Sequence, residues 1–160
     1  SDSRKDDYVL CYEDYWTKKK YKTWKDFLID TAKVRKAVNA SGADEWILHC
    51  EDYWYFLVTF VALLQCKKSV SLTQNISESF IKEMKTPGVQ LWTDVKINDS
   101  DFTFIPDVIE NAELPLEEEI RTTPEINGEE TRIFLFTSGS TGKPKGNRYG
   151  TLWNCQTPNV

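Results

Sequence analysis

The chain has 160 residues, of which 40% are hydrophobic and 13% aromatic, so it can bury a core and is not disordered as a whole. Its formal net charge is -5 and its positive residues are spread along the chain, which disfavours a nucleic acid or an anionic membrane as a partner. The apolar run 54–64 is much shorter than the roughly 20 residues of a bilayer span, and residues 1–7 lack the apolar stretch of a secretory signal. We therefore expect no membrane span and a cytoplasmic location.

Cysteine and histidine are too sparse and too dispersed to predict a metal site. The four cysteines, Cys11, Cys50, Cys66 and Cys155, form no C-x-x-C pair, and His49 is the single histidine. His49 and Cys50 could be a nucleophile pair, but neighbours in an extended strand point to opposite faces. We expect both to be buried structural residues and predict no metal ligand.

The N-terminal stretch up to Lys20 alternates charged and aromatic residues without a clean period, which predicts a strand or loop that packs loosely. Lys18, Lys19 and Lys20 follow Glu13 and Asp14 closely. Such a charge run is typical of a solvated surface turn rather than of a binding patch.

The first helix is predicted from Thr23 to about Ala40. Thr23 and Asp26 have the spacing of a capping box with Asp in place of Glu, and apolar residues follow at helical intervals. Gly42 comes just after this pattern, as glycine does where a helix ends.

Strands and helices then alternate along the chain. The predicted order is strand 46–50, helix 53–65, strand 69–73, helix 78–85 and strand 89–93. Asp52 and Ser77 stand where they can cap the two helices. The alternation predicts an α/β fold with a mostly parallel sheet that is covered on both faces.

Residues 95–128 are acidic and contain several prolines, which predicts a connecting stretch with at most a short strand at 102–105. A strongly apolar strand is predicted at 132–136. It leads directly into ten residues that we call the signature segment, residues 137–146: Thr137-Ser138-Gly139-Ser140-Thr141-Gly142-Lys143-Pro144-Lys145-Gly146.

The composition of the signature segment suits a polyphosphate. It combines four hydroxyl side chains, three glycines and two lysines. Glycine allows the backbone to approach an anion closely, amides and hydroxyls donate to phosphate oxygens, and ammonium groups offset their charge. A flexible Ser/Gly linker is the ordinary alternative for such a composition.

Two better-known nucleotide loops do not fit the signature segment. A Walker A loop needs Ser or Thr after Gly-Lys and a glycine five residues before that Gly, whereas Pro144 follows Lys143 and no glycine stands five residues before Gly142. The Gly-x-Gly-x-x-Gly pattern of dinucleotide-binding folds is absent as well.

The signature segment closely resembles the signature loop of the acyl-adenylate-forming (AMP-binding) superfamily, which includes acyl-CoA synthetases, aryl-CoA ligases and the adenylation domains of peptide synthetases. It fits the usual form of that loop at every position. The upstream strands and helix at 46–73 agree more weakly, and Cys66 and Lys67 depart from the usual small residue and glycine. The resemblance covers about residues 23–146 and is closest to acyl-CoA synthetase or acyl-AMP ligase members.

The resemblance implies a reaction in which a carboxylic acid attacks ATP, with Mg2+ present, to give an acyl-adenylate and pyrophosphate. The acyl group then passes to a thiol acceptor, either coenzyme A or a carrier protein. The residues implied to bind the phosphates are the hydroxyls of Thr137, Ser138, Ser140 and Thr141, the amides of Gly139 and Gly142, and the charges of Lys143 and Lys145. Lys145 matches the lysine that family members retain most often, and no catalytic residue is implied within this chain.

The resemblance also implies that the chain is an N-terminal fragment of the family's large domain. We expect a partial AMP-binding domain at 1–146 and an atypical tail at 147–160, which reads as a truncation or a shifted frame. The adenine-binding and ribose-binding segments and the C-terminal lysine that family members carry downstream do not occur here. By itself such a fragment is expected to be inactive.

Three interpretations therefore stand side by side. The first is a piece of an ATP-dependent carboxylate-activating enzyme. The second is a non-catalytic remnant or binding module that keeps only a polyphosphate-binding loop. The third is an α/β interaction domain in which the signature segment is a linker.

Overall fold

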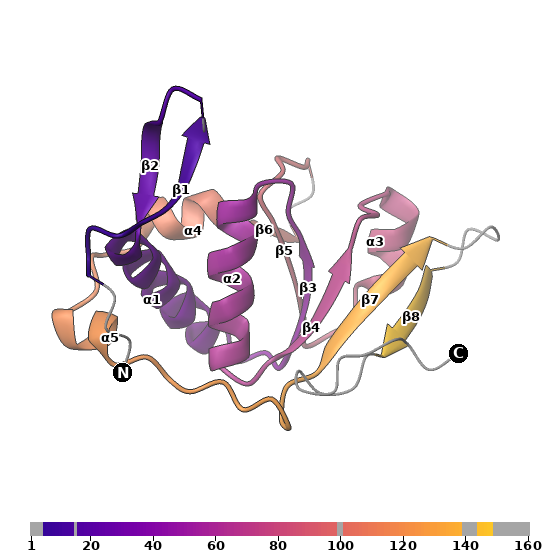
Figure 1. Ribbon diagram of the computed structural model, residues 1–160. Coiled ribbons are helices and arrows are strands. Elements are labelled where there is room, and N and C mark those ends of the chain that lie inside the picture. The colour runs from indigo at the N-terminus through magenta and orange to yellow at the C-terminus, as the bar shows by residue number, and fades with distance from the viewer. Residues whose placement is uncertain (1–4, 15, 99–100, 139–143, 149–160) are drawn as a thin grey trace.

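The computed structural model describes residues 5–14, 16–98, 101–138 and 144–148, which form two β-sheets and five helices (Figure 1). The strands are β1 (Val9–Asp14), β2 (Lys19–Thr23), β3 (Glu45–His49), β4 (Ser69–Thr73), β5 (Val89–Thr93), β6 (Phe102–Phe104), β7 (Ile133–Ser138) and β8 (Pro144–Arg148). The helices are α1 (Trp24–Ser41), α2 (Tyr53–Gln65), α3 (Glu78–Met84), α4 (Ile105–Asn111) and α5 (Glu117–Arg121).

The larger sheet has the strand order β6-β5-β3-β4-β7-β8. All neighbouring pairs from β6 to β7 are parallel, and the pair β7 and β8 is antiparallel. The chain passes from β3 to β4 on one side and then returns to β5 on the other side of β3, so the direction of winding reverses at the middle of the sheet. The predicted α/β fold with a mostly parallel sheet is confirmed.

The helix caps predicted from the sequence are present. Thr23 and Asp26 form the capping box of α1, in which the Asp26 amide donates to Thr23 Oγ1 (3.2 Å) and the Thr23 amide donates to Asp26 Oδ2 (2.8 Å). Asp52 and Ser77 accept hydrogen bonds from backbone amides in the first turns of α2 and α3. Gly42 ends α1 in the left-handed conformation, at φ 70°.

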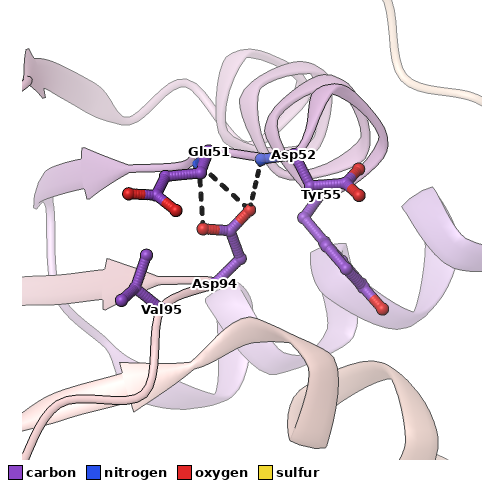
Figure 2. Close-up of a pocket in the computed structure, with 5 residues that line it drawn as sticks. All are labelled: Glu51, Asp52, Tyr55, Asp94 and Val95. Atoms are coloured by element: carbon purple, nitrogen blue, oxygen red, sulfur yellow. Dashed lines mark hydrogen bonds between the residues drawn. The ribbon is translucent and has the colours of Figure 1, made fainter.

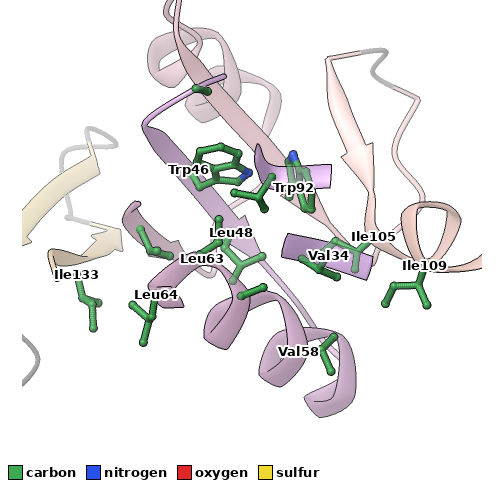
Figure 3. Packing of buried hydrophobic residues seen from close by; sticks show 14 of the residues in the cluster. Val34, Trp46, Leu48, Val58, Leu63, Leu64, Trp92, Ile105, Ile109 and Ile133 are labelled. Atoms are coloured by element: carbon green, nitrogen blue, oxygen red, sulfur yellow. The ribbon is translucent and has the colours of Figure 1, made fainter. Parts of the chain in front are cut away.

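The larger hydrophobic cluster lies between one face of the sheet and the helices α1, α2 and α4 (Figure 3). Its buried members are Val34, Val38, Ala43, Trp46, Leu48, Trp54, Val58, Ala62, Leu63, Leu64, Val70, Trp92, Ile105, Ile109 and Ile133. Trp46 of β3 and Trp92 of β5 meet edge to face, with ring centroids 6.1 Å apart. Aromatic pairs of this kind add to the stabilisation that burial of apolar area already gives.

The opposite face of the sheet is covered by α3. Ile47 of β3 and Leu91 of β5 pack against Phe80 and Ile81 of α3, and the Phe80 ring lies edge to face with Phe136 of β7 at 5.7 Å. Because α2 covers one face and α3 the other, the expectation of a sheet covered on both faces is also confirmed.

The acidic stretch after β5 contains more structure than the sequence predicts. The short strand β6 is present, but α4 and α5 follow it where we expected only a connection. Ile105, Ile109 and Ile120 are buried, so tertiary packing supports helices that are too short to show a period in the sequence. Arg35 of α1 donates from its buried guanidinium to the backbone oxygen of Glu119 (2.9 Å) and so holds α5 in place.

The N-terminal stretch forms an antiparallel hairpin of β1 and β2 rather than a loose segment. Tyr12 and Tyr21 face one another across it with ring centroids 6.3 Å apart. Lys19 and Lys20, which we expected in a surface turn, begin β2, and both are exposed as a solvated charge run should be. Across the described ranges, no helix has both the length and the apolar composition that a bilayer span requires.

Replacement of Gly42 by Ala is expected to lower the free energy of unfolding by about 1 kcal/mol, because a side chain disfavours the left-handed backbone. An added Cβ at Gly42 would meet no atom within 4 Å, so backbone strain is the only source of the loss. Gly42→Asn is the matched control and should lose less, since asparagine tolerates this conformation. Urea unfolding measures all three proteins, and an unchanged Gly42→Ala midpoint would contradict the prediction.

Candidate ligand-binding site

The carboxyl ends of the parallel strands lie at one edge of the larger sheet, and polar residues gather there. His49 ends β3, Thr73 ends β4 and Thr93 ends β5. The strand register pairs His49 with Thr93, puts His49 beside Thr73, and pairs Thr73 with Phe136 of β7. These four residues therefore form one row across the sheet, on the face that α3 covers.

The signature segment begins directly after this row. Thr137 and Ser138 are the last two residues of β7, and the backbone of Lys145 in β8 pairs with that of Thr137. We expected a loop over the whole segment, but its two ends are strands, so the connection is a hairpin. Pro144 is the first residue of the edge strand β8, a position that proline tolerates.

The remaining members of the predicted phosphate-binding set, Gly139, Ser140, Thr141, Gly142 and Lys143, lie outside the described residues. The roles assigned to all eight residues of the set therefore stay predictions. Asn147 and Arg148, which the sequence assigned to the tail, continue β8, and residues 149–160 lie outside the described part of the chain.

His49 is the titratable side chain of the row, and it is buried, with 5% of its surface exposed. Its Nδ1 lies 2.8 Å from the backbone oxygen of Thr73. A carbonyl oxygen can only accept, so Nδ1 carries a proton and donates. In the neutral ring Nε2 is then an acceptor, and it is buried with no hydrogen-bond partner among the residues that the structure describes.

The hydroxyls of the neighbouring threonines are occupied in shaping turns. Thr73 Oγ1 accepts from the amide of Asn75 (3.0 Å) and donates to the Asn75 oxygen (3.1 Å). Thr93 Oγ1 accepts from the amide of Val95 (3.1 Å). The two strand ends next to His49 are therefore held by local hydrogen bonds.

Next to the row, Asp94 organises the N-terminus of α2. Its carboxylate accepts from the amide of Glu51 (2.9 and 3.1 Å) and from the amide of Asp52 (2.7 Å), as Figure 2 shows. Glu51, Asp52, Tyr55, Asp94 and Val95 line a surface pocket at this point. Burial, aided by the negative charge of Asp52 and other nearby carboxylates, raises the pKa of the Tyr55 phenol.

The acidic pocket is not a metal site by its geometry. Within the described ranges, no group of three or more His, Cys, Asp or Glu side chains is arranged to hold a metal ion. Asp94 Oδ1 accepts from the amide of Glu51, and Oδ2 accepts from the amides of Glu51 and Asp52, so this carboxylate serves the fold.

His49 and Cys50 do not form a nucleophile pair. Cys50 packs against the cluster under α1 and α2, whereas His49 lies on the face of α3. Burial, together with the charges of Asp94 and Asp52, raises the pKa of the Cys50 thiol, which keeps it protonated and unreactive. Both were interpreted from the sequence as buried structural residues. His49 is buried, whereas Cys50 is only partly buried.

Sequence reasoning missed the positions of His49 and Asp94 at the carboxyl edge. One signal was available for both, because each stands at or just after the end of a predicted strand, where parallel sheets collect their functional groups. Nothing in the sequence indicated that Asp94 would meet Glu51, since 43 positions separate them.

Comparison with known proteins rests on structure. No protein-family model matches the sequence, and no curated protein is significantly similar to it. The N-terminal subdomain of Klebsiella oxytoca NpsA, solved with 3-hydroxyanthranilyl-AMSN, superposes over 89% of this chain with a TM-score of 0.62 and 17% identity. The o-succinylbenzoate CoA synthetase MenE of Bacillus subtilis, solved with its acyl-adenylate intermediate OSB-AMP, superposes over 88% with a TM-score of 0.60 and 16% identity.

The chain has the fold of part of the NpsA N-terminal subdomain and of part of the MenE structure. The resemblance inferred from the signature segment and the expected architecture are thus confirmed at the level of the fold. This chain spans 36% of the NpsA subdomain structure and 38% of the MenE structure.

Replacement of Asp94 by Ala is expected to lower the free energy of unfolding by about 1.5 kcal/mol, because backbone amides at the start of α2 lose a charged acceptor. Asp94→Asn keeps one acceptor oxygen and should lose less. Thermal unfolding followed by circular dichroism measures both variants. Equal stability of Asp94→Ala and the unchanged chain would show that the carboxylate does not hold this helix end.

Proposed function

We propose that the chain is the polyphosphate-binding part of an ATP-dependent enzyme that activates a carboxylic acid as an acyl-adenylate. One observation carries this proposal: the signature segment starts at the carboxyl end of β7, in a sheet with the fold of adenylate-forming enzymes. Open α/β sheets bind ligands at this edge. A linker would need neither the order of residues in the segment nor its place in the sheet.

In the proposed reaction the substrate carboxylate attacks the α-phosphorus of ATP, and pyrophosphate leaves. The signature segment would hold the β- and γ-phosphates through the hydroxyls of Thr137, Ser138, Ser140 and Thr141 and through the amides of Gly139 and Gly142. Lys143 and Lys145 would offset the charge that builds up on the leaving group. Magnesium is proposed to arrive with the phosphates of the nucleotide.

The second half of the proposed reaction passes the acyl group to a thiol. A structure of MenE with the product analogue OSB-NCoA also superposes on this chain, with a TM-score of 0.58 and 16% identity. It favours coenzyme A as the acceptor over a carrier protein.

A role as a polyphosphate-binding module is the second candidate. It is favoured by the composition of the signature segment, whose hydroxyls, glycines and lysines suit a polyphosphate with or without a chemical step. Measurements of pyrophosphate binding test the polyphosphate affinity that both candidates require. An assay of acyl-adenylate formation separates the enzyme from the binding module.

Magnesium pyrophosphate is expected to bind saturably to the 160-residue chain, and the double variant Ser138→Ala, Thr141→Ala should bind at least tenfold more weakly, since each lost hydrogen bond to a charged group costs about 1.5 kcal/mol. Isothermal titration calorimetry measures both. Thr123→Ala is the matched control, because it removes an exposed hydroxyl outside the signature segment. No binding to the folded chain, or equal binding by the double variant, would refute a phosphate role for the segment.

Lys145→Ala is expected to slow adenylation at least several-fold in a protein that joins this chain to the rest of an adenylate-forming domain, because pyrophosphate departs without its counter-charge. Exchange of labelled pyrophosphate into ATP is the readout. Lys145→Arg keeps the charge and should retain most of the exchange. An unchanged exchange rate in Lys145→Ala would rule out this role.

A further inference from the structure

The hairpin of β1 and β2 stands away from the rest of the molecule (Figure 1). Its base is fixed to the body, because the Trp24 amide donates to the Tyr8 oxygen (2.8 Å) and Lys22 Nζ lies 5.2 Å from the centroid of the Trp54 ring. Residues 16–21, which we call the hairpin tip, are all exposed. Since β2 has five residues and a strand rises about 3.4 Å per residue, the hairpin tip lies about 17 Å beyond the base.

The hairpin tip combines large aromatic side chains with a run of lysines. Trp16 exposes 90% of its surface and Tyr21 exposes 54%. The lysines at 18–20 follow Trp16 closely, and the sequence of the tip contains no acidic residue. Lys20 Nζ lies 3.4 Å from a carboxylate oxygen of Glu13 on the facing strand, but both side chains are largely exposed, and such ion pairs are weak. The tip therefore presents positive charge beside an apolar ring.

Two of these lysines have a backbone conformation that side chains disfavour. The φ angles of Lys18 and Lys20 are 51° and 50°, in the left-handed region where glycine is the usual residue. Backbone outliers of this kind gather at functional positions. For the fold alone glycine would serve at least as well, so what lysine adds at both positions is its charged side chain.

A flat anionic bilayer fits the hairpin tip better than other anionic partners. Tryptophan prefers the boundary between headgroups and acyl chains, and lysines beside it meet the anionic headgroups. The formal net charge of -5, which disfavours such a partner for the chain as a whole, is carried outside the tip. The reach of the hairpin is about two Debye lengths, so salt screens the body from a surface that the tip touches. A nucleic acid requires basic residues along a groove, whereas these lysines gather at one end of a hairpin.

We propose that the hairpin tip docks this chain reversibly on the surface of an anionic lipid bilayer. Trp16 lies at the level of the headgroups, and the lysines at 18–20 contact lipid phosphates and carboxylates. One aromatic anchor with a few lysines gives a weak, salt-sensitive attachment and not a span. The inference does not depend on the signature segment, and pyrophosphate binding tests that segment separately.

Co-sedimentation of the 160-residue chain with vesicles measures this attachment. The chain should bind vesicles of phosphatidylcholine and phosphatidylserine, should bind vesicles of phosphatidylcholine alone much less, and should be released as salt is raised. Trp16→Ala should bind about fivefold more weakly. Tyr53→Ala is the matched control, because Tyr53 also exposes 90% of its surface but lies in α2, and it should bind as the unchanged chain does.

The double variant Lys18→Gly, Lys20→Gly separates docking from folding. It should bind anionic vesicles about tenfold more weakly. Its midpoint of urea unfolding should be unchanged or higher, because glycine accepts the left-handed backbone. The control Lys36→Gln, Lys82→Gln removes the same charge from exposed positions of α1 and α3 and should keep its binding.

Quenching by brominated lipids reports where the tip sits. The chain has six tryptophans, and a brominated acyl chain quenches those that enter the bilayer surface. Quenching should occur in the unchanged chain and disappear in Trp16→Phe, which keeps an aromatic anchor and should still bind the vesicles.

Three results would overturn the inference. The first is equal binding to vesicles with and without phosphatidylserine, or no binding to either by the folded chain. The second is full binding by Trp16→Ala or by the double glycine variant. The third is binding to a single-stranded oligonucleotide but not to vesicles, which would make the hairpin tip a nucleic-acid contact instead.

Discussion

The structure depends on the burial of β3 on both faces. Trp46 and Leu48 are almost fully enclosed under α1 and α2, while Ile47 is enclosed under α3. A strand buried on both sides must be paired on both sides, because its amides and carbonyls have no access to water. β4 and β5 supply these pairs, each in parallel, and the remaining strands add outward from them.

The edge of the sheet that carries the candidate site follows from the same constraint. Since the strands around β3 are parallel, their carboxyl ends come together, and the chain must leave β3 and β4 on opposite faces to cover both sides of the sheet. The polar residues that end these strands are thus collected in one row, and β7 delivers the signature segment to the end of that row. The position of the nucleotide site that we propose therefore follows from the topology of the sheet.

The low identity to the structural neighbours agrees with this account. A fold defined by which positions are buried tolerates exchanges among apolar residues, provided that volume and pattern are kept. At 16 to 17% identity, the present chain keeps the arrangement of strands and helices seen in NpsA and MenE. The core described by the structure includes three buried tryptophans, Trp46, Trp54 and Trp92.

The sequence by itself determined the elements whose signals are local. The capping box of Thr23 and Asp26, the caps Asp52 and Ser77, and the apolar runs of β3, β4 and β5 all act over a few residues, so their positions could be read directly. The residue types of the signature segment also needed no structure to indicate a polyphosphate. Only the tertiary structure decided the strand order, the short helices α4 and α5, and the hairpin of β1 and β2.

The tertiary structure also decided the surroundings of the candidate site. His49 meets the backbone of Thr73 across 24 positions, and Asp52 meets Asp94 across 42. Such contacts depend on the pairing of distant strands, which is set by the burial of the whole sheet and not by any neighbouring residue. The sequence therefore determines which polar residues end the strands, and the packing of β3 between two layers of helices decides which of them lie at the same edge.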